Sequence, residues 1–122
     1  MSKTVLLVDD SATMLMSLKN TLEISGFHVK TAGDGLAALG QVEAGLKPDL
    51  IITDINMPRM DGLALIAAVR RQLRFVPILA LTTESQATKR EEAKRSGATG
   101  WLGKPVGGND LLNVIRQVLP GT

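Results

Sequence analysis

Cysteine is absent from this chain of 122 residues. Without thiols the chain has no disulfide, no thiolate-bound zinc site, no iron–sulfur cluster and no cysteine nucleophile. Histidine is nearly absent: His28 is the single one, which excludes a histidine-rich metal site and leaves a catalytic triad dependent on that residue. There is no tyrosine, one tryptophan and two phenylalanines. So few aromatic rings do not make a surface that stacks single-stranded nucleic acid.

A large excess of either charge is missing as well. The formal net charge is +2, charged residues make up 21% of the chain and hydrophobic residues 44%. These values are typical of a globular protein, and the small positive balance gives no reason to expect nucleic-acid binding. No apolar run approaches the roughly 20 residues that span a bilayer, and the N-terminal segment is too short for a signal peptide. We therefore expect one cytoplasmic domain over residues 1–122, without membrane contact.

Short apolar runs alternate with longer amphipathic segments along the whole chain. A run of aliphatic and β-branched residues predicts a buried strand, and apolar residues three or four positions apart predict a helix. Repeated strand–helix units predict an α/β fold, in which a single doubly wound parallel sheet carries helices on both faces. The five expected strands are 4–8, 27–31, 50–53, 76–81 and 99–102; the five expected helices are the segment between Ser11 and Gly26, 35–44, 63–71, 85–96 and the segment from Leu111 to Leu119.

Polar side chains follow four of these strands at the point where each strand ends. The carboxyl ends of parallel strands lie at one edge of the sheet, where ligands of such sheets bind. We therefore expect these side chains to share one pocket. Asp9 and Asp10 follow the first strand, Asp54 and Asn56 the third, Thr82 and Thr83 the fourth, and Lys104 the fifth.

Three carboxylates in one pocket repel one another, and a divalent cation relieves that repulsion. A ligand set made only of oxygens suits Mg²⁺. A carboxylate is also a nucleophile toward phosphorus, and phosphoryl transfer depends on positioning and charge neutralisation. The set is therefore sufficient for phosphoryl transfer to an aspartate. Taken singly, each member has a plainer interpretation: the aspartate pair as a turn with a helix cap, Thr82 as a cap, and Lys104 as a surface lysine.

Four motifs, in this order and at this spacing, resemble the receiver domains of two-component response regulators over the whole chain. Within that family the chain is similar to the CheY-like single-domain chemotaxis regulators. The resemblance implies a flavodoxin-like fold with strand order 2-1-3-4-5 and five helices. The motifs are Val5–Asp10, Asp54–Pro58 followed by Met60–Gly62, Leu81–Thr83 and Gly100–Pro105.

The resemblance also implies a phosphorylation site. Asp54 would accept a phosphoryl group from a histidine kinase. Asp9, Asp10 and Asp54 would hold Mg²⁺ through their side chains, and Asn56 through its backbone carbonyl. Lys104 would pair with the phosphoryl group, and a cis peptide bond would join it to the proline that follows.

A conformational switch is implied by the same resemblance. Thr82 would move its hydroxyl onto a phosphoryl oxygen, and Trp101 would move inward as the threonine moves. Asn56 and Glu84 match the positions that tune self-hydrolysis in the family, and both favour a short-lived acyl phosphate. The chain is thus expected to be a phosphoacceptor signalling protein rather than an enzyme, apart from its own phosphotransfer and dephosphorylation.

The chain ends at Thr122, shortly after the last expected helix, so we expect a signal sent through a surface rather than through an attached output domain. The fourth helix, fifth strand and fifth helix are the expected surface. The implied partners are a CheA-like histidine kinase and a flagellar motor switch protein, with the chain itself a monomer. Cations gather on the fourth helix, and because Trp101 lies on the adjoining strand they favour docking over a merely solvated helix face; they are Lys89, Arg90, Lys94 and Arg95.

Three alternatives remain open at this point. A phosphate sink would use the same chemistry to drain phosphoryl groups from a shared chemotaxis kinase. A scaffold built on the receiver fold would act without phosphorylation, although the clustered carboxylates argue against it. A flavodoxin-like cofactor binder is disfavoured because Asp9 and Asp10 would repel a cofactor phosphate.

Overall fold

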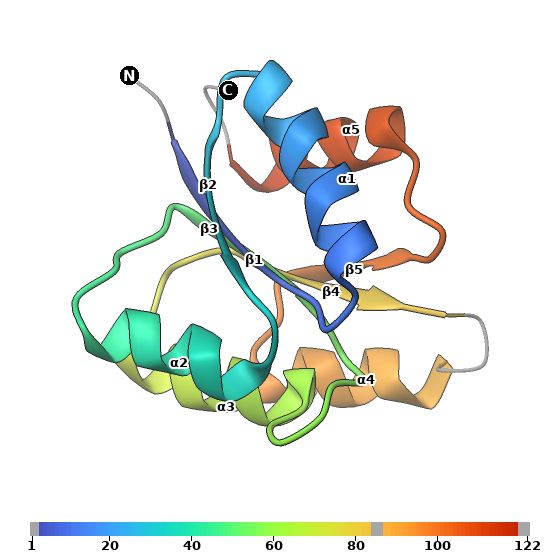
Figure 1. Cartoon of the computed structure of the whole chain (residues 1–122). Coiled ribbons are helices and arrows are strands. Elements are labelled where there is room, and N and C mark those ends of the chain that lie inside the picture. Colours follow the sequence, from blue (N-terminus) through green and yellow to red (C-terminus); the bar gives the residue numbers. More distant parts are fainter. Residues whose placement is uncertain (1–2, 84–86, 120–122) are drawn as a thin grey trace.

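The structure, a computed structural model, describes residues 3–83 and 87–119. Within these residues five parallel strands form one sheet in the order β2-β1-β3-β4-β5, and five helices alternate with them along the chain (Figure 1). The predicted α/β class, strand order and number of elements are confirmed. The strands are β1 (Thr4–Val8), β2 (His28–Ala32), β3 (Leu50–Asp54), β4 (Ile78–Thr82) and β5 (Gly100–Gly103); the helices are α1 (Ala12–Ile24), α2 (Gly35–Glu43), α3 (Gly62–Gln72), α4 (Ala87–Ser96) and α5 (Gly108–Val118).

The sheet divides the core into two apolar layers. Helices α1 and α5 cover one face, and α2, α3 and α4 cover the other (Figure 1). Alternate residues of each central strand contribute to opposite layers: Val5 and Leu7 face α1 and α5, whereas Leu6 and Val8 face α2 and α3. Burial on both faces explains why β1, β3 and β4 read as continuous apolar runs.

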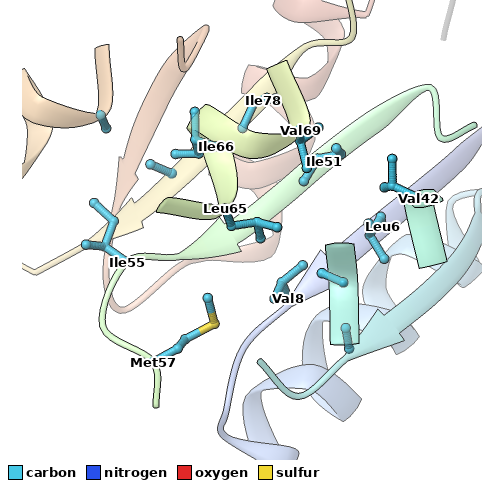
Figure 2. Close-up of a cluster of buried hydrophobic side chains, with 14 residues drawn as sticks. Leu6, Val8, Val42, Ile51, Ile55, Met57, Leu65, Ile66, Val69 and Ile78 are labelled. Atoms are coloured by element: carbon cyan, nitrogen blue, oxygen red, sulfur yellow. The ribbon is translucent and has the colours of Figure 1, made fainter. Parts of the chain in front are cut away.

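Helix α3 is the centre of the larger layer. Figure 2 shows Leu65, Ile66 and Val69 of α3 packed over Ile51 of β3 and Ile78 of β4. All five side chains are fully buried or nearly so. Removing a buried aliphatic side chain of this size costs about 2–5 kcal/mol, so α3 is held rigidly beneath the end of β3.

Several strand boundaries differ from the sequence expectation by one or two residues. Phe27 donates its backbone N–H to the Leu22 carbonyl, so it closes the end of α1 instead of opening β2. The predicted 76–81 strand begins at Ile78, because Pro77 has no N–H to offer the sheet. The same strand extends to Thr82, which is therefore the last residue of β4 and not the first residue after it. Of the predicted 85–96 helix, residues 85 and 86 lie outside the described residues.

The helices begin where the sequence places short polar residues. The Ser11 hydroxyl accepts a hydrogen bond from the Met14 N–H, and the Asp34 and Asp61 carboxylates cap α2 and α3 in the same way. Gly26 follows α1 with a φ of +97°, a backbone conformation that favours glycine. The caps at Ser11, Asp34 and Asp61 fix the loops at the carboxyl edge of the sheet. No helix in the described part of the chain is long and apolar enough to cross a membrane.

Candidate functional site

Three carboxylates meet at the carboxyl edge of the sheet, as the sequence predicts. Val8 at the end of β1 pairs with Thr53 of β3, so Asp9 and Asp54 reach the edge at the same level. One carboxylate oxygen from each of Asp9, Asp10 and Asp54 lies within 4.8 Å of the others. Asp9 is fully buried and Asp54 is 6% exposed, whereas Asp10 is open to solvent. The cluster therefore has a buried base and an accessible rim.

Lys104 adds a cation to this cluster from the end of β5. Its Nζ lies 3.0 Å from Asp54 Oδ2 and 3.3 Å from Asp9 Oδ2. Its backbone N–H donates to the carbonyl of Thr82, which joins the ends of β4 and β5. The Lys104–Pro105 peptide bond is cis, as expected from the family resemblance. The ammonium thus bridges the two buried carboxylates.

The charges of the site perturb one another. Burial raises the pKa of Asp54, and the nearby Asp9 charge raises it further, while Lys104 and the Ile55 N–H act against the shift. Burial lowers the pKa of Lys104, but its hydrogen bonds and attraction to Asp54 and Asp9 outweigh burial and leave that pKa raised. Lys104 therefore stays protonated. The ionised form of Asp54 is disfavoured, and additional positive charge near it would stabilise that form.

The donor atoms of the cluster fit a hard divalent cation. Oδ1 of Asp9 accepts the Ser11 N–H at 2.9 Å, and Oδ1 of Asp54 accepts the Ile55 N–H at 2.8 Å. These bonds fix the orientation of both buried carboxylates. Oxygen is the preferred ligand of Mg²⁺, and incomplete dehydration of that ion suits a site with one open side. Asn56 lies on the loop just beyond Asp54 and is exposed.

That loop is tied to the start of α2. Arg59 forms an ion pair with the buried Asp34, and Gly35 donates its N–H to the Met60 carbonyl at 3.2 Å. Arg59 has a φ of +66°, an unusual conformation for a residue with a side chain. Gly62 donates its N–H to the Ile55 carbonyl at 2.8 Å. The sequence does not predict this support, because no motif links Asp34 to a residue 25 positions later.

The two residues of the expected switch lie on neighbouring strands. Thr82 is fully buried at the end of β4. Trp101 lies on β5, opposite Ala80, and is 40% exposed. Arg90 of α4 contacts both of them. From the sequence alone, Arg90 is only one of the charges on a docking helix. Glu84, predicted to tune self-hydrolysis, lies outside the described residues.

Comparison with known proteins identifies relatives over nearly the whole chain. The family "Response regulator receiver domain" matches residues 5–116. The transcriptional regulatory protein PrrA of Mycobacterium tuberculosis is 37% identical over 118 residues, which are 97% of this chain and 50% of that protein. The response regulator MprA of the same species is 35% identical over 122 residues, 100% of this chain and 53% of that protein. The chain thus spans about half the length of the curated relatives it matches.

Solved structures agree with this assignment. The chemotaxis response regulator CheY4 of Vibrio cholerae superposes with a TM-score of 0.91 and 43% identity, covering 98% of this chain and 100% of that one. A response regulator of Chloroflexus aurantiacus superposes with the same TM-score at 31% identity. Together with the matched family, the flavodoxin-like topology and the acidic cluster at the carboxyl edge, these similarities show that the chain belongs to the receiver domain family of two-component response regulators.

Proposed function

We propose that residues 1–122 act as a receiver domain that takes a phosphoryl group from the phosphohistidine of a histidine kinase onto Asp54. The observation that carries the proposal is the ion pair of Lys104 with Asp54 and Asp9 within the acidic cluster. A buried, oriented carboxylate beside a fixed cation has what an acceptor of a phosphoryl group requires.

The transfer itself demands little covalent chemistry of the protein. A carboxylate oxygen of Asp54 attacks phosphorus, the bond from phosphorus to the imidazole nitrogen breaks, and the imidazole leaves with the bonding electrons. Lys104 Nζ, already 3.0 Å from Asp54, would neutralise one phosphoryl oxygen. We propose that the Thr82 hydroxyl donates to another. Mg²⁺ would neutralise charge on the oxygens of the phosphoryl group during transfer. The residues that would hold it are Asp9, Asp10 and Asp54, with the Asn56 carbonyl.

The proposal includes a short lifetime for the acyl phosphate. Asn56 is exposed beside the acceptor, where its side chain has access to an approaching water. We propose Asn56 and Glu84 as the residues that set the rate of self-hydrolysis. The domain would act in the cytoplasm, where its kinase would supply the phosphoryl group, and we propose that it acts as a monomer.

We propose a chemotaxis output, in which the phosphorylated domain docks on a flagellar motor switch protein through α4, β5 and α5, and a CheA-like kinase supplies the phosphoryl group. The similarity to CheY4, 43% identical over the whole of that chain, supports this output. PrrA, a transcriptional regulatory protein that is 37% identical, supports a second candidate, the receiver half of a transcriptional regulator. A phosphate sink for a shared chemotaxis kinase is a third. Binding of a motor switch peptide to the phosphorylated form alone would favour the first candidate over the other two.

Intact-mass spectrometry tests the chemistry most directly. Wild type, Asp54→Ala and Asp54→Asn are incubated with acetyl phosphate, with and without Mg²⁺. We expect a single phosphoryl adduct on wild type, dependent on Mg²⁺, and none on either variant. An adduct that survives both substitutions would assign the phosphoryl group to another residue, and no adduct on wild type would favour the scaffold that acts without phosphorylation.

A further inference from the structure

Arg90 of α4 joins the two residues of the expected switch. Its Cζ lies 3.9 Å from the centre of the Trp101 ring, well inside the ~6 Å range of a cation–π contact. Its Nε donates a long hydrogen bond of 3.5 Å to Thr82 Oγ1. Arg90 thus contacts the side chains of both Thr82 and Trp101.

The arrangement of the strands makes this link meaningful. In the β4–β5 register Ala80 pairs with Trp101 and Thr82 with Gly103, so the two switch side chains belong to adjacent strands and different positions along them. Thr82 is fully buried, whereas Trp101 is 40% exposed. Arg90 reaches both side chains from α4, the helix that packs beside β4, and it is itself half-buried. Movement of either switch residue therefore disturbs a contact of Arg90.

Arg90 also differs from the other cations of α4. Lys94 and Arg95 are exposed, as residues of a docking face would be. Lys89 forms an ion pair with Glu92. The ion pairs among residues 3–83 and 87–119 do not include Arg90, whose guanidinium instead covers an aromatic ring. Its contacts are those of a residue that positions a neighbour.

We propose that Arg90 is a positioning residue that holds Trp101 outward and engages the Thr82 hydroxyl in the unphosphorylated protein, so that it opposes the switch. The inference rests on the proposed function, in which Thr82 turns toward a phosphoryl group on Asp54. Trp101 makes this stack while it is 40% exposed. A contact made in one of two conformers shifts the balance toward that conformer. Loss of Arg90 therefore favours the inward position of Trp101.

The single tryptophan makes the first arm of the test independent of phosphorylation. Acrylamide quenching of Trp101 fluorescence is measured in the unphosphorylated wild type and in Arg90→Met, Arg90→Gln and Arg90→Lys. Arg95→Met is the matched control, since it removes the same charge from an exposed position of the same helix. Circular dichroism checks that each variant folds, and Arg90→Gln serves if Arg90→Met does not fold.

We expect the ratio of inward to outward Trp101 to rise about two- to five-fold in Arg90→Met and Arg90→Gln, the range that an exposed cation–π contact accounts for. Quenching then falls in both variants, is partly restored in Arg90→Lys, and is unchanged in Arg95→Met. If Arg90 merely covers the ring, its removal exposes Trp101 and quenching rises. Either that rise or an unchanged value overturns the proposal.

A second arm uses the population of the inward conformer, because phosphorylation is expected to proceed from that conformer at a rate that scales with its population. With acetyl phosphate and Mg²⁺, adduct formation is expected to be faster in Arg90→Met than in wild type by a similar factor, with Arg95→Met controlling for lost charge. Equal rates in Arg90→Met and wild type would contradict the coupling. Absence of an adduct in wild type would instead contradict the proposed function, while the quenching arm would still decide whether Arg90 holds Trp101 outward.

Discussion

At the scale of single residues, Asp54 has opposing demands placed on it. Its carboxylate is buried beside Asp9, which raises its pKa, yet a nucleophile toward phosphorus has to be ionised. Lys104 reconciles the two demands in part, since its ammonium lies 3.0 Å from Asp54 Oδ2 and favours the charged form. Keeping Asp54 ionised, and so reactive, thus lowers the free energy of unfolding.

The cost of ionising the buried Asp54 predicts how the stability of the domain depends on pH. The pKa of Asp54 is raised above its ordinary value of 3.8 in the folded chain. Between pH 3.8 and that raised pKa, the folded state therefore holds a proton that the unfolded state has already released. Ionising Asp54 therefore lowers the free energy of unfolding as pH rises through that raised pKa, and the penalty is absent below 3.8. Asp54→Asn removes the penalty, while Lys104 keeps Asp9 as a partner.

Thermal unfolding in the presence of a chelator measures this effect. We expect Asp54→Asn to melt above wild type at neutral pH, and the gap to close as pH falls below 3.8. Asp110→Asn, at an exposed position in the first turn of α5, is the control for loss of one negative charge. A lower melting temperature for Asp54→Asn at neutral pH would mean that the attraction to Lys104 exceeds the cost of burial.

At the scale of elements, the loop between β3 and α3 carries Asn56 and connects to α2. Two glycines allow this close approach. A Cβ at Gly62 would lie 2.2 Å from the Asp54 carbonyl oxygen, and a Cβ at Gly35 would lie 2.4 Å from that of Met60. Both contacts are with backbone atoms, which have little freedom to move away. The position of α3 relative to the acceptor therefore depends on the missing side chain of Gly62.

A matched pair of alanine substitutions tests this dependence. Gly62→Ala is expected to lose about 1–3 kcal/mol of unfolding free energy, the usual cost of overpacking, because backbone has to shift at Asp54 itself. Gly40→Ala, inside α2 with open space around it, is expected to gain about 0.5–1 kcal/mol from helix propensity. Denaturant unfolding measures both. Equal effects at the two positions would show that crowding at Gly62 is relieved without cost.

At the scale of the whole molecule, the site is the place where three strands of the sheet converge. Asp9 follows β1, Asp54 ends β3 and Lys104 follows β5, so residues 95 positions apart meet at 3.3 Å. Two separate apolar layers hold those strands in register. Charge in the site is therefore coupled to the stability of the entire sheet, and a bound cation should stabilise the domain as a unit.

Magnesium is accordingly expected to stabilise the folded domain by mass action. At a concentration 100 times its Kd it should add about 2.7 kcal/mol to the free energy of unfolding, and the melting temperature should rise. A titration with MgCl₂ at constant ionic strength measures the shift. Asp10→Asn changes an exposed member of the cluster and should weaken the response without unfolding the chain. A flat melting temperature in wild type, or an equal rise in Asp10→Asn, would contradict a metal site at this cluster.

Much of the fold and the acidic cluster was predictable because both depend on local patterns. Short apolar runs mark the buried strands β1 and β3, and the parallel arrangement brings whatever follows them to one edge. The places of Asp9, Asp54 and Lys104 at the ends of predicted strands accordingly predict the site. Strand ends were less predictable, since Phe27 and Thr82 take their places through hydrogen bonds to other segments.

The amino-acid sequence by itself determined the α/β class, the helix caps at Ser11, Asp34 and Asp61, and the residues of the acidic cluster, because periodicity, capping and the residues that follow each strand are properties of short segments. Only the tertiary structure decided the contacts made by long side chains that cross between elements. Arg70 of α3 donates to the carbonyl of Gly97 beyond α4, and Arg90 of α4 lies between Thr82 and Trp101. A guanidinium on a flexible stem has many partners within reach, and which of them it meets is set by how the helices pack on the sheet.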